Sequence, residues 1–216
     1  YRNMIGRHEV ATITDTYMKG FRDFDIEKAY EAMKRNSKEA TMLSRHIGKD
    51  WRLNELDKVY LEKGFYPAKP SDQPEWVKEV GFGRQSVALT LENCYDDWCM
   101  SILAKELGKE DDYKYYLNRA YNYRNVFDTK SGFMRPKTAD GKWIEPFDPI
   151  WSGGQGGRDF YTENNGWNYT WYVLHDPQGL INLMEGRSLL LPNSSRCLRR
   201  MSHYIRSMIF LNNIQI

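Results

Sequence analysis

Two long helical patterns in this chain meet at a single glycine, Gly108. The first is the stretch SVALTLENCYDDWCMSILAKELG, from Ser86 to Gly108, and the second, KEDDYKYYLNRAYNYRNVF, begins at the next residue. Acidic residues open the second stretch, where the positive end of a helix dipole favours them. Because so short a joint brings its two helices back side by side, the sequence predicts an antiparallel helical hairpin. Any fold for this chain must accommodate that hairpin.

The first half of the chain contains three further helical patterns, over residues 7–21, 23–40 and 51–64. In each, apolar side chains recur near the spacing that places them on one helix face. Asp25 is predicted to cap the second helix and Gly64 to end the third. The apolar positions are Val10, Ile13, Tyr17 and Phe21 in the first, Ile26, Ala29, Tyr30 and Met33 in the second, and Leu53, Leu56, Val59 and Tyr60 in the third.

Residues 128–167 differ in character, because they are rich in Gly, Pro, Asp and aromatic residues. A loop of this length in a compact domain is usually functional or disordered, and its aromatic content argues against disorder. Helix is predicted to return after it, with Asp176 near the cap and Pro177 at the first helical position. The sequence therefore predicts a mainly α fold with a long aromatic and glycine-rich loop region.

The overall composition excludes several classes of protein. With 216 residues and 41% hydrophobic content, the chain can bury one sizeable core, and its net charge of +2 implies no polyanion partner. No apolar run approaches the roughly 20 residues of a membrane span. Basic residues do not cluster with aromatics, so nucleic-acid binding is not expected. Cys94, Cys99 and Cys197 lack metal-site spacing, and the first two are expected to be buried thiols on a helix. Gly153–Gly157 lacks the ending of a phosphate loop and is interpreted as a flexible rim.

The most unusual segment is YTENNGWNYTWYVLHD, residues 161–176, which combines five aromatic rings with three asparagines and one glutamate, Glu163. Such a mixture fits either an aromatic core or a carbohydrate groove, in which rings stack on sugar C–H faces while amides and carboxylates bind hydroxyls. Glu163 is a candidate general acid, since an apolar pocket favours the protonated carboxyl that such catalysis requires. The alternative is a loop glutamate bonded to backbone N–H groups.

Three other groups of polar residues are candidates for chemistry. Asp96 and Asp97 are adjacent on a predicted helix and point about 100° apart, which favours a structural role over a paired catalytic site. Asp176 is expected to cap a helix, which leaves His175 to contact substrate. Arg135 and Trp143 either serve a sugar or brace the turn that contains them.

Several long stretches resemble glycoside hydrolase family 92. They are MIGRHEVATITDTYMKGFRDFDIEKAYEAM, the whole run from Ser86 to Trp143, and YTENNGWNYTWYVLHDPQGLINLMEG, which together cover roughly residues 3–187. Family members are calcium-dependent, exo-acting α-mannosidases that invert the anomeric centre. The resemblance implies that residues 1–187 are part of an incomplete (α/α)6 toroid acting on terminal α-mannosides of N-glycan or mannan type. It also implies a periplasmic or secreted parent protein. One departure is Leu174, where the family usually has proline.

The resemblance assigns roles to six residues of this chain. Glu163 is expected to be the general acid, and the pocket is expected to be lined by Asn164, Asn165, Trp167, Trp171 and His175. An inverting enzyme needs a second carboxylate about 6.5–9.5 Å away to activate water, and the family's base lies downstream of this chain. Most calcium ligands are also expected there, so none is assigned here. The chain alone is therefore expected to be inactive.

The tail from Ser188 to Ile216 contains four arginines and one histidine but no Asp or Glu. We interpret it as an atypical basic tail, foreign to the fold, as a shifted reading frame or a truncated gene would produce. A basic amphipathic helix packed on the domain is the alternative. Two other functions for the whole chain stay open: a non-catalytic carbohydrate-binding helical module, and a structural helical repeat protein, against which the long loop region argues.

Overall fold

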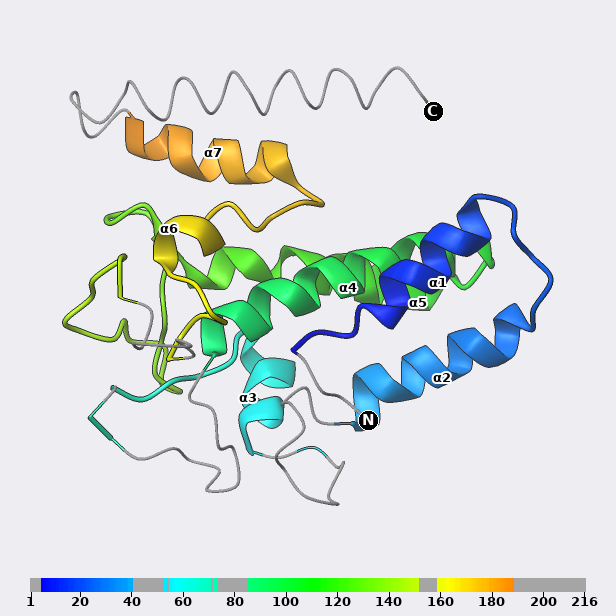
Figure 1. Cartoon of the computed structure of the whole chain (residues 1–216), viewed down its shortest axis with the longest axis horizontal. Coiled ribbons are helices and arrows are strands. Elements are labelled where there is room, and N and C mark those ends of the chain that lie inside the picture. Colours follow the sequence, from blue (N-terminus) through cyan, green and yellow to red (C-terminus); the bar gives the residue numbers. More distant parts are fainter. Residues whose placement is uncertain are drawn as a thin grey trace.

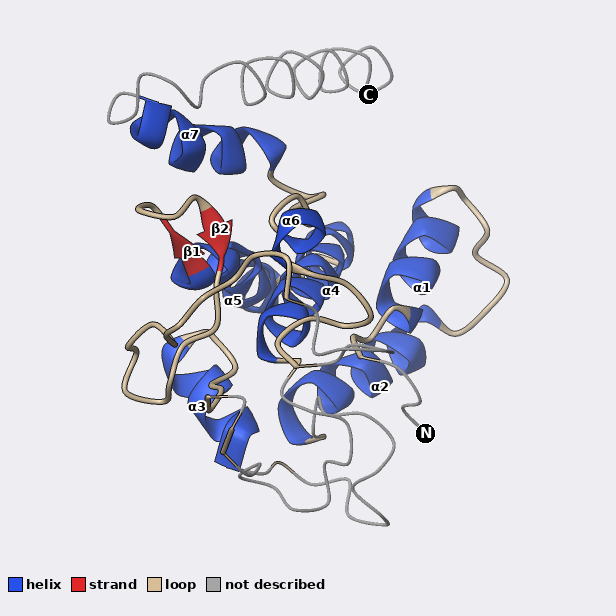
Figure 2. Cartoon of the chain, turned by 60° about the vertical axis from the view of Figure 1, so that its left-hand side comes forward, coloured by secondary structure: helices blue, strands red, loops and turns tan. Residues whose placement is uncertain are grey.

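The described part of the chain is mainly helical, as Figures 1 and 2 show. The computed structural model describes residues 5–40, 53, 55–70, 72–73, 85–151 and 159–188. The helices are α1 (Glu9–Met18), α2 (Ile26–Glu39), α3 (Glu55–Lys63), α4 (Ser86–Glu106), α5 (Glu110–Ala120), the 3₁₀ helix η1 (Tyr121–Val126), α6 (Gly166–Tyr169) and α7 (Pro177–Ser188). The mainly α prediction is confirmed, whereas the partial toroid stays a prediction.

Helix α4 is the centre of the fold. It packs against α5, α1 and η1, and α5 runs back beside it in Figure 1, which confirms the predicted hairpin. Sixteen of its 21 residues are buried. A helix buried on nearly all sides must be apolar on all sides or pair its polar groups. Helix α4 does both, since it carries Leu and Met side chains together with buried Asp96 and Asp97.

Three hydrophobic clusters lie along α4. The first joins its N-terminal half to the loop region and α7, the second joins it to α3, and the third joins its C-terminal half to α1, α2 and α5. Representative buried residues are Val87, Leu91, Tyr161 and Leu180 in the first, Leu56, Tyr60 and Leu89 in the second, and Val10, Tyr30, Met100 and Tyr116 in the third. The loop region therefore shares a packed core with α4 and α7.

A two-stranded hairpin within the loop region was absent from the sequence predictions. Strands β1 (Phe127–Asp128) and β2 (Phe133–Met134) are antiparallel, with Phe127 opposite Met134. The Asp128 carboxylate accepts hydrogen bonds from the backbone N–H groups of Lys130 and Ser131, which shapes the turn. Two residues per strand are too few to produce a readable alternation of polar and apolar residues.

The observed ends of the helices can be compared directly with the predicted cap and stop residues. Asp25 Oδ1 accepts a hydrogen bond of 3.0 Å from Lys28 N, which confirms the predicted cap of α2. Gly64 and Gly108 have φ of +74° and +70°, a conformation that glycine adopts without strain, and each follows a helix end as expected. The inclusion of Phe21 in the first helical stripe was wrong, because α1 ends at Met18 and the Phe21 side chain is 68% exposed.

Several sequence predictions lie outside the described residues. They concern the Gly153–Gly157 rim, Cys197 and the basic tail beyond Ser188. Cys94 and Cys99 are described and are buried free thiols, as predicted. Burial raises the pKa of both thiols, Cys99 to about 12, so both are unreactive at neutral pH.

Candidate functional site

The segment that carries Glu163 is attached to the N-terminus of α4. The Phe160 carbonyl accepts hydrogen bonds from Val87 N (3.0 Å) and Ala88 N (3.3 Å). These amides belong to the first turn of α4, whose N–H groups have no partner within the helix. Thr162 Oγ1 also donates to Gln85 Oε1 at 2.8 Å. The loop thus caps α4, and this largely buried helix holds the candidate acid in place.

Glu163 is exposed and has a left-handed backbone, with φ of +53°. This conformation disfavours residues with a Cβ by roughly 1–2 kcal/mol. Among the described non-glycine residues only Gln85 also has positive φ, at +21°, and it contacts Thr162, the neighbour of Glu163. Backbone strain of this kind persists where surrounding contacts enforce it, and it is concentrated at functional sites. The geometry therefore supports Glu163 as a presented carboxylate.

The two asparagines predicted to contact a sugar also shape the loop. Asn165 Oδ1 accepts from Trp167 N (3.1 Å) and Asn168 N (3.4 Å) and so caps the short helix α6. Asn164 Oδ1 accepts from Asn165 N at 3.0 Å and from the Asn168 side chain. Both amides are thus engaged through their carbonyl oxygens, and their contact with substrate stays a prediction.

The predicted aromatic residues divide into a surface group and a buried group. Trp167 is 50% exposed and stands edge-on to Phe133, with ring centroids 4.9 Å apart. Trp171 is half-buried and packs against the loop-region core. Tyr161 is buried and donates to the Met134 carbonyl at 2.7 Å. Trp167 is therefore the predicted residue that offers an aromatic surface to a ligand.

His175 lies among the rings of Tyr95, Trp98 and Tyr123, whose centroids are within 6.4 Å of its own. Its Nε2 is 2.8 Å from the Ala120 carbonyl, which identifies Nε2 as the protonated nitrogen. Burial lowers the pKa of His175, so the ring is held neutral. These contacts join the start of α7 to the end of α5. A substrate contact for His175 stays a prediction.

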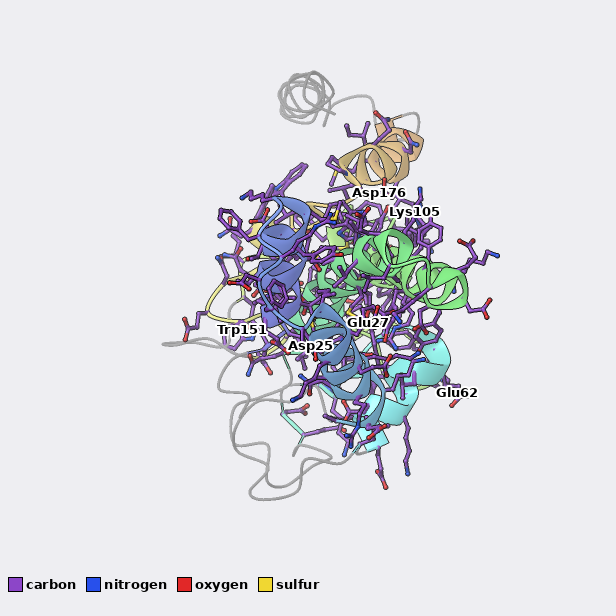
Figure 3. The ribbon with its side chains drawn as sticks, turned by 90° about the vertical axis from the view of Figure 1, so that its right-hand side faces the viewer. Asp25, Glu27, Glu62, Lys105, Trp151 and Asp176 are labelled. Carbon is purple, nitrogen blue, oxygen red and sulfur yellow. The ribbon has the colours of Figure 1, made fainter. Side chains whose placement is uncertain are left out.

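Asp176 confirms its expected role as a cap. Its Oδ1 accepts from Gly179 N at 2.9 Å, at the first turn of α7 (Figure 3). Its Oδ2 accepts from the Tyr123 hydroxyl at 2.7 Å and from Arg124 at 3.2 Å. The same carboxylate therefore caps one helix and attaches it to η1.

A polar cluster that sequence reasoning missed joins the start of α1 to α4. His8 Nε2 is 3.0 Å from Glu92 Oε2, and His8 Nδ1 is 3.1 Å from Asp96 Oδ1. Hydrogen bonds to Asp96 and then Glu92 raise the pKa of His8 to about 10, so the ring is an imidazolium. Tyr172 donates to Glu92 Oε2 at 2.7 Å. The available sequence signal was Glu92 itself, the one charged residue between Ser86 and Tyr95.

Tyr169 is close to both the His8 cluster and the candidate acid. Burial raises the pKa of Tyr169 to about 12, and the nearby charges of Glu92 and Glu163 act in the same direction. Its ring lies 5.9 Å from that of Tyr172, and its hydroxyl is 3.5 Å from the Thr162 carbonyl. The charges of Glu163 and Glu92 are therefore both close enough to act on the hydroxyl of one tyrosine.

Asp97 has the structural role that the sequence favoured. It is fully buried and accepts from Arg7 Nη2 (2.7 Å), Arg119 Nε (2.8 Å) and, more weakly, the Tyr60 hydroxyl (3.4 Å). Burial alone would lower the pKa of both arginines, but the Asp97 charge raises them. Asp96 accepts from Arg7 N and His8 instead. Two adjacent aspartates thus serve different partners, as their angular separation on a helix requires.

Arg135 braces its turn. It is buried, with Nη1 2.8 Å from Asp128 and Nη2 2.7 Å from Glu145. Its guanidinium lies 5.5 Å from the centre of the Trp143 ring. Both residues are therefore used to hold the β1–β2 hairpin against the following loop, the second of the two roles that the sequence left open.

Comparison with known proteins identifies the family to which this arrangement belongs. The family model for the glycosyl hydrolase family 92 catalytic domain matches residues 1–193. The chain belongs to glycoside hydrolase family 92. The match includes all of the described elements, and it extends a few residues beyond the stretch over which the resemblance was recognised.

Solved members of the family have the same arrangement of helices. A family 92 inverting mannosidase from Bacteroides thetaiotaomicron is 34% identical, with a TM-score of 0.68 over 86% of this chain and 22% of its own. An α-mannosidase of the same family and organism, in complex with mannoimidazole, is also 34% identical, with a TM-score of 0.69 over 92% of this chain and 22% of its own.

A curated relative comes from a fungus. It is an uncharacterized secreted glycosidase of Arthroderma benhamiae, 29% identical over 85% of this chain. The chain spans 25% of that relative's length and 22% of each of the two bacterial structures. The sequence thus corresponds to under a third of a family 92 protein.

Proposed function

We propose that this chain is the general-acid part of an inverting α-mannosidase that releases terminal mannose from N-glycan or mannan-type oligosaccharides. Glu163 is the proton donor to the glycosidic oxygen. The observation that carries the proposal is the presentation of this exposed carboxylate on a strained backbone that the first turn of α4 fixes. Membership of family 92 and the mannosidase relatives support the choice of sugar.

The chemistry requires two carboxylates on opposite faces of the sugar ring. One protonates the leaving oxygen, and the other activates a water molecule from about 6.5–9.5 Å away. Glu92 shares the neighbour Tyr169 with the candidate acid, but it is already paired with His8 and Tyr172. We therefore propose that the base comes from a part of the parent protein that follows this chain, as the family resemblance implies.

Glu163 is exposed in this chain, whereas a general acid works in an enclosed pocket. The remaining parts of a family-length enzyme would provide that enclosure. Half-exposed Trp167 would then form one wall, with Asn164 and Asn165 beside the acid, and His175 is the further residue proposed to contact the substrate. The described helices include none that is long and apolar enough to cross a membrane. A secreted or periplasmic parent protein is part of the proposal, which the secreted fungal relative supports.

Calcium is a further part of the proposal, as the resemblance implies. Calcium takes roughly six to eight oxygen ligands. Among the described residues no three His, Cys, Asp or Glu side chains are placed to hold a metal ion. We therefore assign no calcium ligand in this chain and derive no step through the ion.

The decisive experiment replaces Glu163 in the family-length enzyme. With α-mannobiose as substrate, Glu163→Gln should lower kcat by about 10²–10⁴-fold, the usual contribution of general acid catalysis. With α-mannosyl fluoride the loss should be much smaller, because fluoride leaves without a strong need for protonation. Asn168→Ala, in the adjoining short helix α6, is the matched control for local disturbance and should show no such difference between substrates.

Three outcomes would count against the proposal. Equal losses on both substrates would make Glu163 a structural residue. An active Glu163→Gln enzyme would remove the general-acid role altogether. Mannose binding by the 216-residue chain that is unchanged by Glu163→Gln and independent of calcium would favour a non-catalytic binding module.

A further inference from the structure

A cavity of about 590 Å³ lies in the loop region beside the candidate active site. Its volume is within the roughly 300–1,000 Å³ of typical small-molecule sites. Three aromatic rings, three carboxylates and three prolines are among its lining residues. The aromatics are Phe147, Trp151 and Phe160, and the carboxylates are Asp72, Glu145 and Asp148. Glu163 is not part of this lining, so the cavity is separate from the proposed acid.

Trp151 is the main aromatic surface of the cavity. Its side chain is 48% exposed, and its indole Nε1 donates to Asp159 Oδ2 at 3.0 Å. Figure 3 places it at the outer edge of the loop region, well apart from Asp176 and α7. A hydrogen bond that fixes an exposed indole prepares its face for a ligand, because less side-chain freedom is lost on binding. The electron-rich face of an indole attracts the polarised C–H groups of a pyranose.

The carboxylates suit a ligand rich in hydroxyl groups. Asp148 Oδ1 accepts from Ile150 N at 2.9 Å, and among the described residues its Oδ2 has no hydrogen-bond partner. Glu145 gives one oxygen to Arg135 at 2.7 Å while its side chain stays 68% exposed. The described acidic groups do not have the arrangement of a metal site. Carboxylates at the edge of an aromatic cavity can instead accept hydrogen bonds from sugar hydroxyls.

A line of aromatic rings joins the cavity to the candidate active site. The ring centroid of Phe147, in the cavity wall, lies 6.0 Å from that of Phe133. The Phe133 centroid lies 4.9 Å from that of Trp167. On the other side, a Cβ at Gly166 would be 3.3 Å from the Pro149 carbonyl, so the loop that carries Trp151 packs directly on the start of α6. The cavity and the Glu163 loop are therefore parts of one surface. Trp167 and Trp151 are the exposed tryptophans of these two parts.

We infer that this cavity is a subsite for the leaving-group side of the substrate, in which Trp151 stacks on a neutral pyranose residue and Asp148 accepts its hydroxyls. The inference rests on the proposed function, since it takes Glu163 as the point of cleavage. It makes Trp151 a specificity residue for oligosaccharides over mannosides with small leaving groups. Binding energy at such a remote position selects substrates without touching the bond that breaks.

The experiment compares two substrates in the family-length enzyme. Trp151→Ala should lower kcat/KM for α-mannotriose by roughly tenfold, mainly through KM, as removal of a central aromatic contact does. The same variant should leave kcat/KM for α-mannosyl fluoride unchanged, because fluoride has no sugar to stack. Trp151→Phe keeps a ring and should recover part of the loss. Ile150→Ala removes a neighbouring exposed side chain outside the cavity lining and should behave as wild type.

The outcomes separate this inference from the proposed function. Equal losses on both substrates, or no loss on mannotriose, would overturn the subsite while leaving Glu163 as the acid. An enzyme that stays fully active on mannotriose after Glu163→Gln would instead overturn the proposed function. Asp148→Asn is a second test that keeps side-chain size, and it should raise KM for mannotriose alone. Thermal unfolding midpoints of all variants would identify any that act through folding.

Discussion

The charged centre of α4 and the loop around Glu163 look alike in sequence but differ in burial and in backbone conformation. Both place acidic residues beside tyrosine and tryptophan, in YDDW and in YTENNGW. Asp97 is fully buried and held by two arginines, whereas Glu163 is exposed on a strained backbone. A buried charge is retained only when it is paired, because desolvation is otherwise too unfavourable. The comparison teaches that the surroundings, and not the neighbouring residues in sequence, decide which carboxylate holds the fold and which is presented to a ligand.

The largest effect should come from removing the buried charge. Asp97→Asn leaves Arg7 and Arg119 buried without their counter-charge, and loss of one partner in such a pair lowers the free energy of unfolding by about 3–5 kcal/mol. Glu163→Gln should change it by less than about 0.5 kcal/mol, as exposed substitutions do. Urea unfolding of the 216-residue chain would measure both. A similar stability loss in the two variants would remove the distinction between the regions.

A smaller effect on stability should come from replacing His8, whose ring contacts both Asp96 and Glu92. Its folded pKa of about 10 is above its ordinary value of 6.5, so its contribution to stability is complete below pH 6.5 and is lost as pH rises through 10. Since His8 is partly exposed, that contribution should be only about 0.5–1 kcal/mol. The stability difference between wild type and His8→Gln should therefore shrink between pH 6.5 and 10. A constant difference would show that the imidazolium is not stabilised by these carboxylates.

His175 should show the opposite dependence on pH. Burial lowers its pKa, so the unfolded chain binds the proton more readily, and stability should fall as pH drops below the ordinary histidine value. Wild type should therefore lose stability relative to His175→Gln as the pH falls. Unfolding midpoints between pH 5 and 7 would test the sign. A wild-type chain that becomes more stable relative to the variant in acid would contradict the buried neutral ring.

The smallest effect concerns the backbone of Glu163. Glycine adopts positive φ freely, so Glu163→Gly should relieve strain and offset the entropy that glycine adds to the unfolded chain. The net change in stability should lie within about 1 kcal/mol and favour the variant. Glu31→Gly, at an exposed position inside α2, should instead destabilise by about 1 kcal/mol. If both variants lose the same stability, the left-handed conformation at Glu163 carries no strain.

The helical frame was readable from the sequence because its signals are local. The cap at Asp25, the stops at Gly64 and Gly108 and the hairpin of α4 and α5 each depend on residues only a few positions apart. The structural role of Asp97 also followed, from the angle between adjacent residues on a helix. Local patterns of this kind survive folding when the tertiary contacts agree with them.

The details of the candidate site were less readable because they depend on distant contacts. His8 meets Glu92 and Asp96 across more than 80 positions, and no periodic pattern encodes such a pairing. Left-handed φ is more common at Asn or Gly than at Glu, so the residue type of Glu163 gave no sign of its backbone conformation. The cavity below Trp151 joins segments near residues 72, 147 and 160, and its existence depends on how those loops close.

The Phe160 carbonyl accepts hydrogen bonds from Val87 N and Ala88 N, so movement of the candidate acid loop away from α4 would break both bonds. Detaching the loop would expose these two amides to solvent, so their hydrogen exchange would report loop opening directly. A glycan that orders the loop should slow exchange at both amides while leaving the middle of α4 unaffected. Helix α4 would thereby act as a built-in sensor of ligand binding, one that does not depend on turnover.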